Sequence, residues 1–380
     1  MTKITKKVLI VNQSAELYGS DRSLLDLLTI LPTSGYQPVV VLPEQGPLLE
    51  KIRALGIEVY VFEIFKLSRS IFKLSTLVKM PFTLYRVFKD LSRLNRLHQF
   101  DLSYTNTLAV LGLPLWARMH RIPHIWHVRE IIETPRFVSS VYKKIVPLLS
   151  DHIVCNSKNT LEWLEPPDHV SSHVIWNGIE ATRRIFRNPY QTLSAPLPVV
   201  LLAGRINHWK GQDLLLAASV QNFKSGNLYN LVFLGSAAEG QEALVSALRE
   251  SIKQSGFEKY IQHVDFVSDA TPYYQHADLV VVPSTKPEPF GRVAIEAMAC
   301  AKPVLAASHG GLIEIVQHQR TGLLFTPNSI TELANCLKVL VSDAQMRLAF
   351  GEAGQIRQAA YFSLQAYQSK LLAVFAAIKH

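Results

Sequence analysis

The chain has 380 residues, of which 48% are hydrophobic, and its formal net charge at pH 7 is +9. This length exceeds what one hydrophobic core usually supports, so we expect two domains, and the apolar content excludes an intrinsically disordered protein. Because no apolar run reaches the roughly 18–20 residues of a membrane-spanning helix, we expect neither a transmembrane span nor a signal peptide.

The charge and the cysteines narrow the class of protein further. A strongly basic chain predicts an anionic partner, which could be nucleic acid, an acidic lipid surface or a phosphorylated substrate. The three cysteines, Cys155, Cys300 and Cys336, form no Cys-x-x-Cys pair and no regular spacing with histidine. We therefore expect no disulfide framework, no metal site and a cytoplasmic location.

The first half of the chain predicts alternating strands and helices. Short apolar strands are expected at 6–11, 38–43, 57–62, 101–105, 123–127, 150–156 and 174–177. This alternation is typical of a doubly wound parallel sheet, so we predict a Rossmann-like domain over 1–179. No Gly-x-Gly-x-x-Gly follows the first strand, so a dinucleotide cofactor is not supported. The polar, proline-containing stretch 180–198 is interpreted as a linker.

Two places in this half are candidates for ligand contact. His127 ends the expected strand 123–127, and ligands of α/β proteins bind at the carboxyl ends of strands. A structural core histidine fits the same pattern. Gly19 and Ser20 lie in the loop after the first strand, although Ser20 or Asp21 could simply cap the next helix. Arg129 and Glu130, close to His127, are weaker candidates.

The segment from Ile64 to His98 is basic and rich in aromatic residues. Its cations are Lys66, Arg69, Lys73, Lys79, Arg86, Lys89, Arg93 and Arg96, and its single acid is Asp90. One interpretation is a helical hairpin that packs on the sheet and has a solvated cationic face. The other is a surface that contacts an anionic membrane, since each cation near such a surface adds about 1 kcal/mol of attraction. Nucleic-acid binding is not expected, because no reading motif accompanies the charge.

The second half repeats the alternation and carries a short cationic loop. Strands are expected at 199–203, 230–235, 263–267, 279–282 and 303–307, which predicts a second Rossmann-like domain over 199–362, and 363–380 is expected to be a final helix. Directly after 199–203 come Gly204, Arg205, Lys210 and Gly211. An arginine fork and a lysine point charge suit a diphosphate, although either residue could be an ordinary surface charge.

Two glutamates stand out between 281 and 305. Glu288 lies in a loop rich in proline and glycine, and Glu296 lies in a helix whose other residues are almost all apolar. A carboxylate at such a position is costly unless something pairs with it. Strand, Gly291-containing loop and helix N-terminus together favour an anionic ligand. The alternative is that Glu296 pairs with a neighbouring loop and that Glu288 is solvated.

The segment Val281–Leu305 resembles the Glu-x7-Glu signature of glycosyltransferase family 4, the retaining nucleotide-sugar transferases of the GT-B fold. The match extends over Phe-Gly-x-Val-x-Ile-Glu-Ala-Met-Ala, and the Gly-Arg-x4-Lys-Gly stretch at 204–211 and the Trp-His-x-Arg-Glu stretch at 126–130 are similar to motifs of the same family. The resemblance implies two Rossmann-like domains that face each other across a cleft, with the final helix crossing back onto the N-terminal domain.

The resemblance also assigns roles to residues. It implies that Arg205 and Lys210 bind the donor pyrophosphate, that Glu296 accepts hydrogen bonds from the ribose hydroxyls, and that Glu288 contacts the donor sugar. His127 would contact the donor sugar or the acceptor, and Gly19-Ser20 would lie near the acceptor and the donor phosphates, where many relatives have Gly-Gly. The remaining residues expected at the nucleotide-sugar site are Gly204, Gly235, Val267, Phe290, Gly291 and Arg292, and the backbone N–H groups of Gly310-Gly311 could face the same diphosphate.

The expected reaction is transfer of a sugar from a nucleotide-diphosphate donor, with retention, to a glycan or lipid-linked acceptor in cell-envelope polysaccharide synthesis. Because the chain has no Asp-x-Asp, we expect no metal. The nucleotide sugar is expected as a co-substrate, without any other cofactor. Replacing Arg205 or Lys210 by Ala is expected to abolish transfer and barely change stability. A nucleotide-sugar epimerase of the same fold and a non-catalytic membrane-binding protein remain alternatives.

Overall fold

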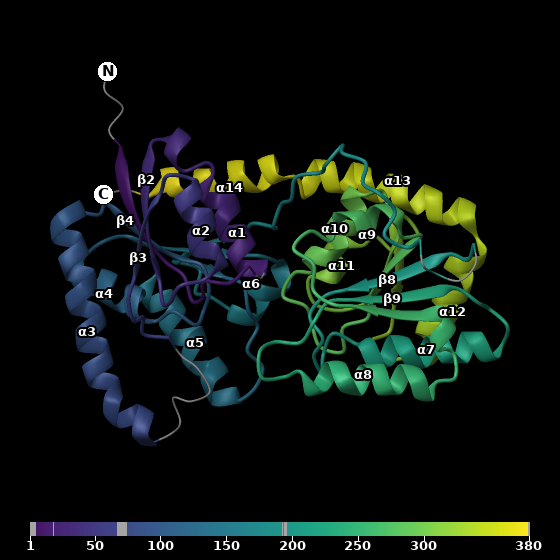
Figure 1. The fold of residues 1–380 in the computed structure, drawn as a ribbon. Helices are drawn as coiled ribbons and strands as arrows, with labels where there is room; N and C mark the ends of the chain where they lie inside the picture. The colour runs from purple at the N-terminus through teal and green to yellow at the C-terminus, as the bar shows by residue number, and fades with distance from the viewer. Residues whose placement is uncertain (1–4, 18, 67–73, 192, 194–195, 379–380) are drawn as a thin grey trace. The chain divides into compact units, whose positions relative to one another are not determined.

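The computed structural model describes residues 5–17, 19–66, 74–191, 193 and 196–378, and of 74–78 the backbone alone. The chain divides into two compact units, residues 1–177 with 364–380 and residues 178–363. Each unit contains one sheet whose strand pairs are all parallel (Figure 1). The predicted fold class, α/β with two Rossmann-like domains, is confirmed.

The first unit contains a seven-stranded sheet in the order β3-β2-β1-β4-β5-β6-β7. Its strands are β1 (Lys6–Val11), β2 (Tyr36–Leu42), β3 (Glu58–Val61), β4 (Leu102–Thr105), β5 (His124–Val128), β6 (His152–Cys155) and β7 (Ser171–Val174). Its helices are α1 (Gly19–Leu28), α2 (Pro47–Ala54), α3 (Leu74–His98), α4 (Gly112–His120), α5 (Arg136–Leu149), α6 (Lys158–Leu164) and α14 (Leu364–Ala377).

Helices cover both faces of this sheet, which explains why its central strands are apolar throughout. In β1, Val8 and Ile10 join the core formed with α1, α2 and α14, while Leu9 and Val11 join the core formed with α3 and α4. Successive side chains of a strand point to opposite faces, so a strand covered on both sides has no polar face. The C-terminal helix α14 packs beside α1 in this unit (Figure 1).

The second unit contains a six-stranded sheet in the order β10-β9-β8-β11-β12-β13. Its strands are β8 (Val199–Ala203), β9 (Asn230–Leu234), β10 (Ile261–Val264), β11 (Leu279–Val282), β12 (Val304–Ala307) and β13 (Gly322–Phe325). Its helices are α7 (Gln212–Lys224), α8 (Ala243–Gln254), α9 (Thr271–His276), α10 (Arg292–Ala299), α11 (Leu312–Ile315), α12 (Ile330–Ser342) and α13 (Ala344–Tyr361). A core cluster joins the sheet to α7, α8 and α12, and α10 packs against α9 and α13.

Two predicted strands were placed a few residues too late. The strand expected at 174–177 is β7, which ends at Val174, and the one expected at 263–267 is β10, which ends at Val264. Both are edge strands, with β7 paired only to β6 and β10 paired only to β9 in their sheets. An edge strand tolerates polar residues on its open side, so its apolar pattern is weak and the neighbouring apolar run misled the prediction.

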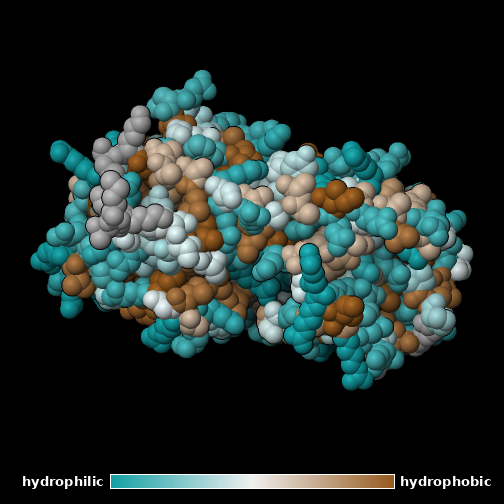
Figure 2. Space-filling model, turned by 90° about the horizontal axis from the view of Figure 1, so that it is seen from above, coloured by the Kyte–Doolittle hydropathy of each residue, from teal (hydrophilic) through white to brown (hydrophobic). Residues whose placement is uncertain are grey.

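The basic segment also differs from one interpretation of the sequence. In the described part, 74–98 forms the single helix α3 and not a helical hairpin, and Arg69 and Lys73 lie outside the described residues. Val87, Leu91 and Leu94 form its buried stripe at helical spacing. Figure 2 shows one face of the molecule, on which hydrophobic patches alternate with hydrophilic groups.

Candidate functional site

The cationic loop and the glutamate loop of the second unit leave two neighbouring central strands. β8 and β11 pair directly, and the strand order runs from β8 toward β10 on one side and from β11 toward β13 on the other. The chain therefore reverses its direction across the sheet between β8 and β11. In open parallel sheets this reversal leaves a crevice at the carboxyl ends of the strands, where ligands bind.

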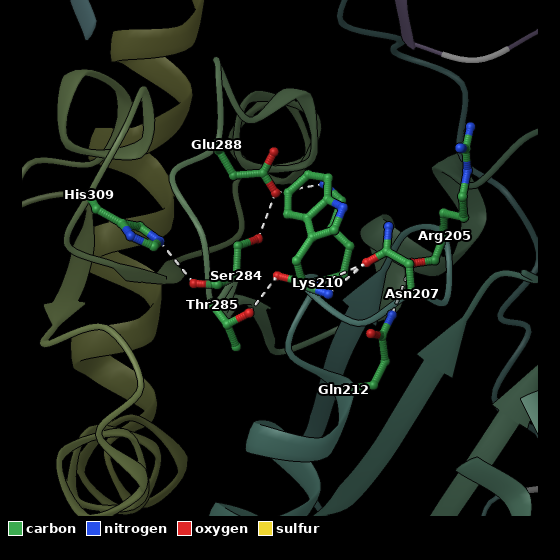
Figure 3. Close-up of polar contacts among 9 residues, drawn as sticks. Arg205, Asn207, Lys210, Gln212, Ser284, Thr285, Glu288 and His309 are labelled. Atoms are coloured by element: carbon green, nitrogen blue, oxygen red, sulfur yellow. Dashed lines mark hydrogen bonds and ion pairs between the residues drawn. The ribbon is translucent and has the colours of Figure 1, made fainter. Parts of the chain in front are cut away.

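Lys210 and Glu288 form an ion pair at this point. Lys210 Nζ lies 2.6 Å from Glu288 Oε1, and the Ser284 hydroxyl donates a hydrogen bond of 2.6 Å to the same oxygen (Figure 3). The Glu288 side chain is 5% exposed and the Lys210 side chain 20%. Lys210 Nζ also lies 4.4 Å from the centre of the Trp209 ring. Two residues that the sequence assigned to one site are thus in direct contact.

The backbone of both loops is fixed by further hydrogen bonds. Asn207 Oδ1 accepts from the backbone N–H groups of Trp209, at 3.1 Å, and Lys210, at 2.9 Å. The Thr285 N–H donates to the Trp209 carbonyl at 2.8 Å, which joins one loop to the other. The sequence analysis missed Asn207, although an asparagine that precedes a tight loop commonly forms this kind of turn.

Gly310 and Gly311 pack closely against the backbone of the loop that contains Glu288. The Gly311 N–H donates to the Glu288 carbonyl at 2.7 Å, so the expectation that it faces a diphosphate was wrong. A Cβ atom at Gly311 would lie 2.5 Å from the Phe290 carbonyl oxygen. Glycine is required here for close backbone packing. The Phe290 side chain is itself buried and so supports the loop from within.

Arg205 and Glu296 occupy different surroundings from the ion pair. Arg205 is exposed, and Figure 3 shows its guanidinium extending away from Lys210 and Glu288. Glu296 lies in α10, which begins after Gly291 at a φ of 112°. Its Oε2 accepts a hydrogen bond of 2.9 Å from the Tyr274 hydroxyl, and its Oε1 lies 3.5 Å from Arg292 Nε. The remaining lone pairs of this half-buried carboxylate suit hydroxyl donors.

The other predicted residues of this unit lie at the ends of strands. Gly204 follows β8 and Gly235 follows β9, where a Cβ on Gly235 would lie 2.2 Å from the Gly204 carbonyl oxygen. Close backbone packing therefore requires glycine at 235, whereas a Cβ on Gly204 would meet nothing within 4 Å. Val267 lies beyond the end of β10 and is half-buried.

A second polar cluster lies at the carboxyl ends of β1, β4 and β5 in the first unit. His127 is fully buried, and its Nδ1 lies 2.7 Å from the Tyr104 hydroxyl. The amide of Asn106 donates to the Ser20 carbonyl at 2.8 Å, and its oxygen accepts from Arg129 Nε at 2.9 Å. The predicted Gly19-Ser20 segment and His127 are therefore joined through Asn106 and Arg129.

The sequence analysis missed the asparagines of this cluster. Asn12 directly follows β1 and Asn106 directly follows β4, and both are buried. Their position after adjacent central strands, where the order of the first sheet reverses, is the signal that could have identified them. The Asn12 amide donates to Asp21 Oδ1 at 2.8 Å, so Asp21 is a buried acceptor at the start of α1.

Burial controls the protonation of this cluster. It lowers the pKa of His127 well below the usual value, and the positive charge of Arg129 acts in the same direction. His127 is therefore neutral at physiological pH. Its Nε2 atom is buried and has no hydrogen-bond partner. Burial also raises the pKa of Glu130 to about 7, although Glu130 Oε2 accepts from the N–H groups of Leu108 and Arg129.

The described residues contain no group of three or more His, Cys, Asp or Glu side chains that could hold a metal ion. Within the same ranges, no helix is both long and apolar enough to cross a membrane.

Two family models match the chain. Residues 18–183 match Glycosyltransferase Family 4, and residues 190–357 match Glycosyl transferases group 1. A curated relative, the D-inositol 3-phosphate glycosyltransferase of Jonesia denitrificans, is 36% identical over 47% of this chain and 42% of its own length. The enzyme of that name from Thermobispora bispora is 29% identical over 70% of this chain and 65% of its own length. The chain thus spans only part of these relatives, about half of several of them.

Solved structures agree in fold. Anabaena Alr3699/HepE in complex with UDP and glucose has a TM-score of 0.82 and 25% identity, and the match covers 98% of this chain and all of that one. A glycosyltransferase from Rickettsia africae has the same TM-score at 19% identity, with 98% of each chain covered. With both halves matched by family models, the chain belongs to the group 1 glycosyltransferases of family 4.

Proposed function

We propose that the chain is a glycosyltransferase that moves a sugar, with retention of anomeric configuration, from a nucleotide-diphosphate donor to a glycan or lipid-linked acceptor. The observation that carries the proposal is the Lys210–Glu288 pair, which lies where the strand order of the second unit reverses. The complexes of Anabaena HepE with UDP and with UDP-glucose support a nucleotide sugar as the donor.

In this proposal each charged side chain acts on a different part of the donor. Arg205 and Lys210 neutralise the diphosphate as it leaves, Glu288 contacts the sugar, and Glu296 accepts hydrogen bonds from the ribose hydroxyls. Stabilisation of the charge that develops on the leaving group is usually the largest catalytic contribution, and positioning of the two reactants is the next. The absence of an Asp-x-Asp motif supports neutralisation by side chains instead of a metal ion.

The Lys210–Glu288 ion pair is also compatible with a site in which a bound donor competes for the Lys210 ammonium. In the ligand-free chain each charge satisfies the other, which avoids the cost of an unpaired carboxylate in a buried position. A bound diphosphate would compete for the Lys210 ammonium, which has three donors, and Glu288 would then be available to hydroxyl donors on the sugar.

The test is an assay of nucleoside diphosphate release from a panel of nucleotide sugars, with and without candidate acceptors. A transferase forms glycosylated product only with an acceptor, and NMR of the product gives its anomeric configuration. Conversion of the donor to an epimer in the absence of acceptor would instead identify the alternative, an epimerase. Thermal shifts with the same panel identify the preferred donor without requiring an acceptor.

The N-terminal unit is proposed to rest on an anionic membrane, at the inner face of the plasma membrane, where a lipid-linked acceptor of polysaccharide synthesis would be presented. Opposite its buried stripe, α3 exposes Phe82 by 71% and Tyr85 by 69%, and Leu97 near the end of the helix is exposed by 67%. The same side carries the exposed cations Lys79, Arg86, Lys89, Arg93 and Arg96. Aromatic side chains among cations are typical of helices that lie in a membrane interface.

A further inference from the structure

Arg129 is a buried cation whose three nitrogens are all engaged. Nε donates to Asn106 Oδ1 at 2.9 Å and Nη1 to Asn177 Oδ1 at 2.5 Å. Nη2 lies 3.0 Å from the Tyr367 hydroxyl and 3.3 Å from His127 Nδ1. The contacting residues lie directly after β4, in β5, at the end of the first unit's main segment and in α14, so the guanidinium is held in one orientation.

This orientation determines which nitrogen of His127 carries the proton. A guanidinium has donors and no acceptor, so His127 Nδ1 must accept from Arg129 through a lone pair. The Tyr104 hydroxyl lies 2.7 Å from the same nitrogen and 3.3 Å from Asn106 Oδ1, and the shorter contact favours donation of its one proton to His127. In a neutral imidazole one nitrogen is a donor and the other an acceptor, and the hydrogen bond at one sets the state of the other. A neutral His127 that accepts at Nδ1 carries its proton on Nε2.

His127 Nε2 is consequently a buried N–H group without a partner. A buried N–H group without an acceptor is costly, and the cost disappears when an acceptor binds. Since Nε2 already carries a proton, it cannot accept one from a substrate hydroxyl. It can donate a hydrogen bond to a substrate oxygen.

We propose that Arg129 and Tyr104 are positioning residues, which hold His127 as the neutral tautomer protonated at Nε2, so that this atom donates a hydrogen bond to an oxygen of the sugar or the acceptor. The part of the inference that concerns the substrate rests on the proposed function. The part that concerns the tautomer does not, and it can be measured in the ligand-free chain.

The experiment is 15N NMR of the histidine side chains in the full chain, with the His127 signals assigned from the spectrum of His127→Gln. The expected result is an unprotonated Nδ1 and a protonated Nε2, without titration between pH 5 and 8. In Arg129→Lys and in Tyr104→Phe we expect a measurable population of the other tautomer or the onset of titration. Arg118→Lys, an exposed arginine of the same unit, is the matched control and leaves the His127 signals unchanged.

A protonated Nδ1 in the wild-type chain overturns the proposal, as does a wild-type His127 spectrum in both variants. Because Tyr104→Phe keeps the ring and removes one hydroxyl, it preserves a test if Arg129→Lys does not fold. Activity gives an independent test. His127→Gln keeps an N–H donor and should retain more transfer than His127→Ala, for which loss of one hydrogen bond predicts about a tenfold fall in kcat/KM.

Equal activity of these two variants, at a level far below wild type, contradicts donation by Nε2. The outcomes separate the two proposals. The expected tautomer in a chain that transfers no sugar from any donor would refute the proposed function and leave the positioning of His127 established. Transfer by a chain whose His127 is protonated at Nδ1 would support the proposed function and refute the positioning of His127.

Discussion

Lys210 Nζ lies 2.6 Å from Glu288 Oε1, so two loops that leave the neighbouring strands β8 and β11 are joined by a charge pair. Ser284 donates to the same carboxylate oxygen, and Gly311 donates to the Glu288 backbone carbonyl. Glu288 is therefore held from three directions. This arrangement ties the stability of the second unit to residues that are proposed to act on the donor.

Replacing Lys210 by Ala is predicted to lower the free energy of unfolding by about 3 kcal/mol, because it leaves a buried carboxylate without its cation. This revises the expectation from the sequence that stability barely changes. Urea unfolding of Lys210→Ala, Glu288→Gln and the double variant measures the coupling. The loss of unfolding free energy in the double variant should be smaller than the sum of the losses in the two single variants. Strict additivity would show that the pair contributes nothing, and Lys253→Ala, an exposed lysine of α8, is the control.

Replacing Glu296 by Gln is predicted to weaken the binding of nucleoside diphosphates. The substitution replaces one carboxylate oxygen by an NH2 group, which cannot accept a hydrogen bond from a ribose hydroxyl. The Tyr274 hydroxyl can still donate to the remaining oxygen, so the melting temperature should change little. Calorimetry with free nucleotide measures the effect, and Glu352→Gln on the exposed side of α13 is the matched control. Unchanged affinity together with a lower melting temperature would mean that Glu296 is structural.

Glu130 predicts a specific pH dependence of stability. Burial raises the pKa of Glu130 from 4.5 to about 7, so between these values the folded chain keeps a proton that the unfolded chain has released. The contribution of Glu130 to the free energy of unfolding is therefore fully present below pH 4.5 and is lost as the pH rises through 7. Glu130→Gln mimics the protonated form.

The wild-type minus Glu130→Gln difference in unfolding free energy should thus fall from pH 4.5 to 7 and level off above. Urea unfolding at a series of pH values measures it, and Glu133→Gln, an exposed neighbour, should show no such slope. A difference that is flat across this window rules out the raised pKa.

The exposed face of α3 predicts salt-sensitive binding to anionic vesicles. Changing Lys89, Arg93 and Arg96 to Gln should remove about 1 kcal/mol of attraction per charge, and changing Phe82 and Tyr85 to Ser should reduce binding further. Vesicle sedimentation at low and high salt is the measurement. Phe266→Ser, an exposed aromatic of the second unit, serves as the control. Equal binding to neutral and anionic vesicles would contradict a membrane contact.

Much of the fold was predictable because central strands are apolar on both faces and are bounded by clear turns. The runs at β1, β8 and β11 matched their predicted bounds, whereas the edge strands β7 and β10 did not. The charged candidate residues were chosen from motifs whose spacing is specific, and the structure brings Lys210 and Glu288 into contact. Local sequence carried no sign that Lys210 pairs with Glu288, because the contact joins residues far apart in the chain.

Hydrogen-bond networks were the other feature that the sequence did not reveal. The Arg129 guanidinium contacts Tyr367 of α14, far along the chain, and such a contact depends on how α14 docks onto its sheet. Gly311 illustrates the same limit on a smaller scale. Its sequence neighbourhood suggested a free N–H group, but the folded chain uses that group to hold the Glu288 carbonyl.

Lys210 and Glu288 are proposed to form part of a donor site for a nucleotide sugar, and donor binding and turnover in Lys210→Ala, beside wild type and Lys253→Ala, test this directly. We predict that wild type and Lys253→Ala bind a nucleotide sugar equally. We also predict that Lys210→Ala, still folded by circular dichroism, loses roughly 10²–10³ in kcat, the scale for removing one group that stabilises developing charge. Wild-type turnover in a folded Lys210→Ala variant would show that Lys210 does not act on the donor.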